Sequence, residues 1–117
     1  MDLINELEAL GVNTQEALRR FSGNSALYVK MLGKLTAAAN DLEVMPCIEK
    51  EDYETAVTNA HTLKGVTGNL SLTPLYNAYT DITNLLREQK YGDAKSVLEK
   101  ILPVQSDILE CIEKSKS

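Results

Sequence analysis

The chain has 117 residues, of which 44% are hydrophobic and 25% charged, and its formal net charge is −5. This size and composition predict a single globular domain over residues 1–117 and exclude a disordered chain. No apolar run approaches the roughly 20 residues that cross a bilayer, and 12 basic residues against 17 acidic ones give no footprint for nucleic acid. We therefore expect neither a membrane nor a nucleic acid as partner.

The N-terminal sequence and the cysteines indicate a reducing compartment and no metal. MDLINELEALG lacks the basic start, apolar stretch and cleavage site of a secretory signal, which favours a cytoplasmic protein. Cys47 and Cys111 are far apart and have neither a CxxC neighbour nor a second histidine, so zinc-binding and redox spacings are absent. We expect both to be reduced, partly buried thiols.

Two short helices are predicted at the N-terminal end. Leucines and an isoleucine at helical spacing predict a helix over residues 3–10, which ends before Gly11. Thr14 is the expected N-cap of a second helix, TQEALRRF, and the segment SGN at 22–24 ends it.

Longer helices follow. From Ser25 the apolar residues keep a 3.6-residue period to about residue 42, and Pro46 then breaks or kinks the helix. The next periodic series predicts a helix over residues 51–70. Its core stripe consists of Tyr53, Ala56, Ala60, Leu63 and Leu70.

Two further helices complete the predicted fold. Thr73 and Pro74 form a cap and first-turn signal for a helix that continues to about residue 89. Gly92 and Asp93 start the last helix, with a kink expected at Pro103. No segment shows strand alternation, and the connections are short. An all-α bundle with antiparallel neighbouring helices is therefore predicted.

The only histidine of the chain lies in AHTLKGVTGN, residues 60–69. At 100° per residue, His61 points about 120° from the centre of the core stripe, at its margin or into solvent. Lys64, Gly65 and Gly68 fall with it inside an arc of about 100°. These four residues therefore form one face of the helix.

This face has two structural interpretations. An exposed histidine is commonly a solvated polar residue, and a helical glycine often marks close contact with a neighbouring helix. However, each glycine weakens a helix by about 1 kcal/mol relative to alanine, and two of them beside an outward-facing residue favour a surface that a partner must approach.

The chemistry open to this face is narrow. Free imidazole has a pKa of about 6.5, so at pH 7 a large fraction of it is neutral and can act as a nucleophile. One histidine is too few ligands for a metal, and no motif supplies a Ser or Cys nucleophile with an oxyanion loop. Phosphoryl transfer needs mainly positioning and charge neutralisation. Lys64 supplies a positive charge that suits a phosphoryl group, although its position is equally consistent with an ordinary solvated lysine.

At these residues the sequence resembles the histidine-containing phosphotransfer (HPt) domain. The motif residues that match are His61, Leu63, Lys64, Gly65, Gly68 and Asn69. GVNTQEALRRFSGNSALYVKML resembles the N-terminal segment of the family, and KEDYETAVTNAHTLKG its central helix, so the resemblance covers nearly the whole chain. It implies an antiparallel up-down four-helix bundle with one or two short N-terminal helices.

The resemblance also implies a function. His61 would be phosphorylated on a ring nitrogen by a receiver-domain aspartate or a kinase, and would pass the phosphoryl group to another receiver aspartate. Lys64 would support the phosphoryl charge, Gly65 and Gly68 would give access, and Val57 and Asn69 would belong to the docking face or support the motif. The chain itself would carry no cofactor, because the receiver supplies the acidic pocket and magnesium.

The expected partners are response-regulator receiver domains, a hybrid sensor histidine kinase, or both, and the chain is expected to be a monomer without autonomous turnover. The sequence departs from the family at Ile82 and Thr83, where LE is common, and at Pro46, where many relatives continue a helix. The alternative is a helical adaptor that docks a signalling partner without phosphotransfer. An autonomous phosphatase or hydrolase is a third possibility, for which the sequence offers no second catalytic group.

Overall fold

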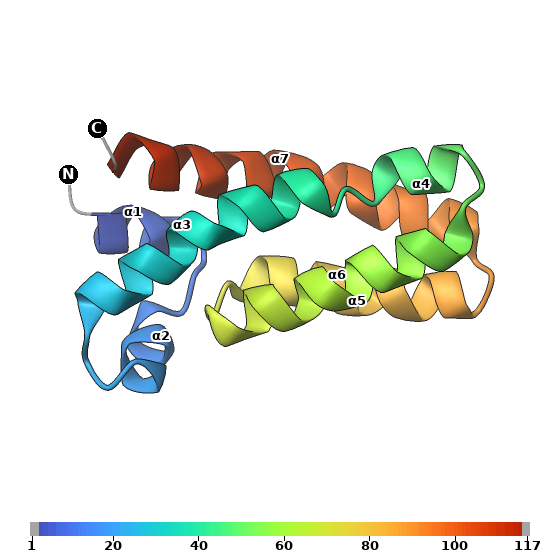
Figure 1. Ribbon diagram of the computed structural model, residues 1–117. Coiled ribbons are helices and arrows are strands. Elements are labelled where there is room, and N and C mark those ends of the chain that lie inside the picture. The colour runs from blue at the N-terminus through green and yellow to red at the C-terminus, as the bar shows by residue number, and fades with distance from the viewer. Residues whose placement is uncertain (1–2, 116–117) are drawn as a thin grey trace.

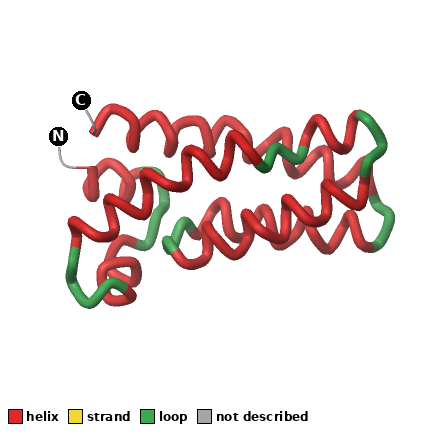
Figure 2. Tube along the Cα trace, viewed as in Figure 1, coloured by secondary structure: helices red, strands yellow, loops and turns green. Residues whose placement is uncertain are grey.

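The computed structural model describes residues 3–115, and these residues form seven helices and no strand (Figure 1 and Figure 2). The helices are α1 (Leu3–Ala9), α2 (Thr14–Arg20), α3 (Ser25–Asp41), α4 (Met45–Glu49), α5 (Tyr53–Asn69), α6 (Thr73–Arg87) and α7 (Tyr91–Ser115). The predicted all-α class is confirmed. Of the predicted domain over 1–117, residues 1, 2, 116 and 117 lie outside the described residues.

Asparagine and aspartate side chains begin three of the helices. Asn13 caps α2 by accepting a hydrogen bond from the backbone N–H of Glu16 at 3.1 Å. Asn24 and Asp52 do the same for α3 and α5. The prediction that Thr14 caps α2 is therefore wrong: the stronger capping residue directly before it takes the position, and Thr14 is the first helical residue and is buried.

Thr73 is not a cap either. The N-cap position of α6 belongs to Leu72, which makes no side-chain hydrogen bond and is fully buried. Because the core holds Leu72, the chain enters the helix one residue earlier than predicted. Pro74 lies in the first turn, as expected, where its missing N–H leaves no hydrogen bond unmade.

Four helices end at a residue in the left-handed backbone region that is not glycine. These residues are Ser22, Glu51, Ser71 and Gln89, with φ between 54° and 62°. Each follows the C-cap of its helix, so the chain turns without the glycine that usually marks such an end. This explains why the predicted range 51–70 shortens to Tyr53–Asn69, and why α6 ends at Arg87 and α7 begins at Tyr91.

Pro46 acts differently from its prediction. α3 ends at Asp41, before Pro46, and Pro46 instead lies in the first turn of the short helix α4, which the sequence pattern did not predict. A proline is well tolerated there because the first N–H groups of a helix have no partner within it. Pro103 lies inside α7, which runs as one helix from Tyr91 to Ser115.

The long helices pack around one core. α5 packs on α6, α6 packs on α7, and α3 contacts both α5 and α7. Tyr28 and Tyr79 are the largest fully buried side chains of this core. The start of α5 and the start of α7 lie at the opposite end of the molecule from α1 and α2 (Figure 1). There the rings of Tyr53 and Tyr91 stack with their centroids 3.5 Å apart and join the two helices.

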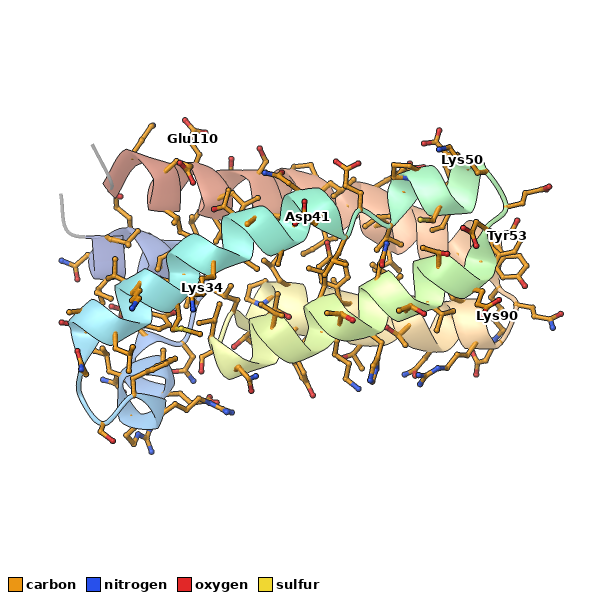
Figure 3. The ribbon with its side chains drawn as sticks, in the orientation of Figure 1. Lys34, Asp41, Lys50, Tyr53, Lys90 and Glu110 are labelled. Carbon is orange, nitrogen blue, oxygen red and sulfur yellow. The ribbon has the colours of Figure 1, made fainter. Side chains whose placement is uncertain are left out.

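Charged residues along the helices, such as Lys34, Asp41 and Glu110, which are labelled in Figure 3, are exposed. Cys47 and Cys111 are free and partly buried, as predicted. Within residues 3–115 no helix has the length and apolar character that spanning a membrane requires.

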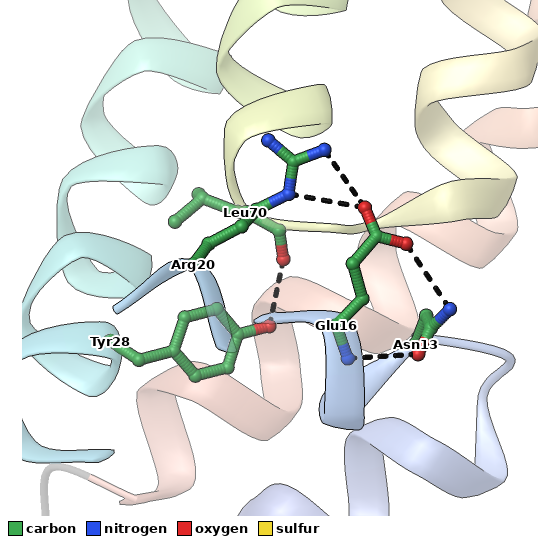
Figure 4. Close-up of polar contacts among 5 residues, drawn as sticks. All are labelled: Asn13, Glu16, Arg20, Tyr28 and Leu70. Atoms are coloured by element: carbon green, nitrogen blue, oxygen red, sulfur yellow. Dashed lines mark hydrogen bonds and ion pairs between the residues drawn. The ribbon is translucent and has the colours of Figure 1, made fainter. Parts of the chain in front are cut away.

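The turn between α5 and α6 is tied to the N-terminal segment. The Tyr28 hydroxyl of α3 donates a buried hydrogen bond of 2.9 Å to the carbonyl of Leu70 (Figure 4). The N–H of Asn13 donates to the carbonyl of Ser71 at 3.3 Å. The first bond joins α3, and the second the N-cap of α2, to the segment between α5 and α6.

Candidate functional site

The core residues of α5 set the direction of His61. Ala56, Ala60, Leu63 and Thr67 are buried and lie on one face. His61 points about 130° from the centre of that face, counting 100° per residue, and its side chain is exposed. The prediction that the imidazole lies at the margin of the core stripe or in solvent is confirmed.

His61 lies in a groove of about 560 Å³ between three elements, which we call the His61 groove. α5 forms one side, α2 forms another, and the α5–α6 turn with the first turns of α6 completes it. The lining residues are Glu16, Arg20, His61, Lys64, Gly65, Gly68, Asn69, Ser71, Thr73, Tyr76 and Asn77.

The groove brings together five of the six residues that the sequence singled out. His61, Lys64, Gly65, Gly68 and Asn69 all line it. Val57, one turn before His61, does not: its side chain is partly buried and packs against the hydrophobic core.

The two glycines differ in their surroundings. A Cβ atom built on Gly65 would meet no heavy atom within 4 Å, so the helix surface there is open. A Cβ atom on Gly68 would lie 2.8 Å from Cδ1 of Tyr76. Of the two interpretations that the sequence left open, close contact with a neighbouring helix therefore applies to Gly68, whereas Gly65 leaves free space beside His61.

The His61 groove carries more positive than negative charge, although the chain as a whole has a net charge of −5. Arg20 and Lys64 line it against one carboxylate, that of Glu16. Within residues 3–115, neither His61 nor Lys64 takes part in an ion pair. The imidazole and the ammonium group are thus free to meet an anion that enters the groove.

The side of the groove opposite α5 carries residues that no sequence motif singled out. Glu16 and Arg20 form an ion pair at 2.8 Å along α2, and Tyr76 extends from α6 over Gly68. The spacing of an acid and an arginine four residues apart is visible in TQEALRR, but that pattern is typical of any solvated helix. Only the tertiary contacts of the N-terminal segment bring this pair to the same groove as His61.

The residues that depart from the HPt pattern lie elsewhere. Ile82 and Thr83 are almost fully buried, and the Thr83 hydroxyl donates to the carbonyl of Tyr79. Neither residue lines the His61 groove. Pro46, the third departure, does not line the groove either, so a partner confined to this groove would touch none of the three positions.

The arrangement suits nucleophilic attack by an imidazole on an electrophile that carries negative charge. An exposed ring can be reached from solvent, and a lysine three residues later on the helix lies on a neighbouring part of the same surface. In the part of the chain from 3 to 115, no three His, Cys, Asp or Glu residues lie close enough together to hold a metal ion. Comparison of the chain with protein-family models, with curated proteins and with solved structures finds no match.

Proposed function

We propose that this protein is a phosphorelay carrier of the HPt type, which accepts a phosphoryl group on His61 and passes it on. The observation that carries the proposal is the exposed imidazole of His61, which forms no ion pair within residues 3–115, beside the open surface at Gly65 and in a groove that Lys64 also lines. The sequence resemblance at the same residues supports it independently of the groove. The alternative, an adaptor that binds without phosphotransfer, shares the docking surface but needs no free imidazole.

In the proposed step, the lone pair of one His61 ring nitrogen attacks the phosphorus of a receiver aspartyl phosphate. The P–N bond forms as the P–O bond to the aspartate breaks, and the aspartate leaves as a carboxylate. The other ring nitrogen keeps its proton. Lys64 stabilises the charge on the transferring phosphoryl oxygens, and the reverse reaction delivers the group to a second receiver.

The partner of the carrier is a receiver domain, a hybrid sensor histidine kinase, or both. The receiver contributes the acidic pocket and magnesium. The four long helices α3, α5, α6 and α7 form an antiparallel up-down bundle in this proposal, in agreement with their mutual contacts. The chain acts as a cytoplasmic monomer and completes no reaction by itself.

The test is incubation with a receiver domain that has been phosphorylated with acetyl phosphate, followed by mapping of the label. Because the chain has a single histidine, an acid-labile, comparatively base-stable label identifies His61. The His61→Gln variant should take no label. An acid-stable label, or transfer to another residue, would contradict the proposal. Unchanged receiver binding by His61→Gln, with no label on the wild type, would support the adaptor.

A further inference from the structure

Arg20 lies across the His61 groove from α5 and is held by a carboxylate on its own helix. Its Nε and one Nη donate to the same oxygen, Glu16 Oε1, at 3.1 and 2.8 Å (Figure 4). The other oxygen of Glu16 accepts a hydrogen bond of 3.2 Å from the Asn13 side chain. The Asn13 side chain thus fixes the orientation of the Glu16 carboxylate. The Arg20 guanidinium has further N–H donors that this ion pair does not use.

The ion pair is in water, so it is weak and its partners can separate. The side chains of Arg20 and Glu16 are 49% and 40% exposed. Exposed pairs of this kind contribute little to stability because solvent screens them. A ligand with more negative charge can therefore replace Glu16 as the partner of Arg20.

The position of α2 places the Arg20 side chain at the His61 groove. Val12 and Ala17 are buried on one side of the segment, and the N–H of Asn13 is bonded to the turn that follows α5. Arg20 consequently lines the His61 groove, whereas Arg19, its exposed neighbour on the same helix, does not. The two arginines form a matched pair for experiment.

We infer that Arg20 binds the phosphoryl group carried by His61, and exchanges its contact with Glu16 for the phosphoryl oxygens. This inference rests on the proposed function and adds a phosphoryl-binding residue from outside the helix that bears the histidine. A phosphoryl group carries up to two negative charges and offers three acceptor oxygens, which match the fork of an arginine better than one carboxylate oxygen does. No covalent bond changes in this exchange.

Lys64 and Arg20 then hold the phosphoryl group from two sides. Lys64 lies on the helix of His61, and Arg20 approaches from α2 across the groove. Glu16 stays in place through Asn13 and repels the phosphoryl group, so it limits how strongly Arg20 can bind. Removing the Glu16 charge should therefore strengthen the contact, and removing Arg20 should abolish it.

The experiment uses chemical phosphorylation of the whole chain with potassium phosphoramidate, which needs no receiver. Phosphorus NMR then follows the titration of the phosphohistidine with pH. A nearby cation favours the dianion, so the phosphoryl pKa should rise by about 0.2 to 0.7 pH units in Arg20→Ala. Arg20→Lys should restore part of this change. Arg19→Ala should titrate like the wild type.

Glu16→Gln supplies the second arm. It should lower the phosphoryl pKa in the wild-type background and have a smaller effect when combined with Arg20→Ala, because the freed arginine is then absent. Thermal melts of each variant check that the fold is kept.

Equal titrations of wild type and Arg20→Ala, or an equal rise in Arg19→Ala, would overturn the inference and leave the proposed function standing. Failure of a phosphorylated receiver to label His61 would instead overturn the proposed function. The NMR titration thus tests the role of Arg20, and the transfer assay tests the proposed function.

Discussion

Alanine substitutions at Gly65 and Gly68 should change the free energy of unfolding in opposite directions. At Gly65 the added methyl group meets no heavy atom within 4 Å, and the residue lies inside α5 with ordinary helical geometry. Alanine there restricts the unfolded chain and should stabilise the protein by about 0.5 to 1 kcal/mol. For a chain of this length the melting temperature should rise by roughly 2 to 4 °C.

At Gly68 the same methyl group meets the ring of Tyr76. Its Cβ would lie 2.8 Å from Cδ1 and 3.0 Å from Cε1, so the ring has to move. Cδ1 is near the base of the ring, which means that a small rotation of the far end does not relieve the contact. Overpacking of this kind costs about 1 to 3 kcal/mol, against a helix-propensity gain of about 1 kcal/mol. We therefore expect a net destabilisation of about 1 kcal/mol.

Urea unfolding of four variants tests this reasoning. They are Gly65→Ala, Gly68→Ala, Tyr76→Ala and the double variant Gly68→Ala/Tyr76→Ala. Once the ring is gone, Gly68→Ala should stabilise the protein much as Gly65→Ala does. The coupling energy between positions 68 and 76 should be about 1 to 2 kcal/mol. If Gly68→Ala is as stabilising as Gly65→Ala whether or not Tyr76 is present, the packing argument is refuted.

The remaining predictions concern the open surface, the groove lysine and the buried tyrosines. Gly65→Gln should melt at or above the wild-type temperature and yet slow transfer from a phosphorylated receiver by on the order of tenfold; equal rates would mean that no partner approaches there. Lys64→Ala should slow transfer by a similar factor and change the unfolding free energy by less than about 0.5 kcal/mol. Lys50→Ala, at the far end of the molecule (Figure 3), serves as its control and should change neither the transfer rate nor the unfolding free energy. Burial raises the pKa of Tyr28 and of Tyr79 from 10.0 to about 12. Because the folded protein favours the neutral phenols, the two tyrosines contribute their full share of the unfolding free energy below pH 10, and this share is lost as the pH rises toward 12. In urea unfolding, Tyr28→Phe should therefore lose less stability than the wild type over this pH range.

Periodicity was sufficient to predict every helix except α4, and also the direction of His61. When a helix buries Ala56, Ala60 and Leu63, its 3.6-residue turn fixes the direction of His61, which must point away from the core. The ends of the helices were harder to predict. Ser71 and Gln89 adopt left-handed backbone geometry without being glycine, so the usual stop signal is missing from the sequence.

The far side of the groove could not be predicted from local pattern. Arg20 and His61 are 41 positions apart, and they share a groove because tertiary contacts, such as the hydrogen bond from the Asn13 N–H to Ser71 and the burial of Val12 and Ala17, place α2 beside the turn after α5. The same limit applies to Gly68, whose neighbour Tyr76 belongs to the next helix. Spacing alone did not distinguish a glycine that faces solvent from one that faces a ring.

The anchoring of α2 to a turn rather than to the length of α5 has an evolutionary consequence. Substitutions on the groove side of α2 change neither the helix that carries His61 nor the core beneath it, since Glu16 and Arg20 are exposed and bonded mainly within their own segment. Duplicated copies of such a gene could diverge in which partner they accept by altering this short helix alone, while the residues that present the imidazole stay under unchanged selection.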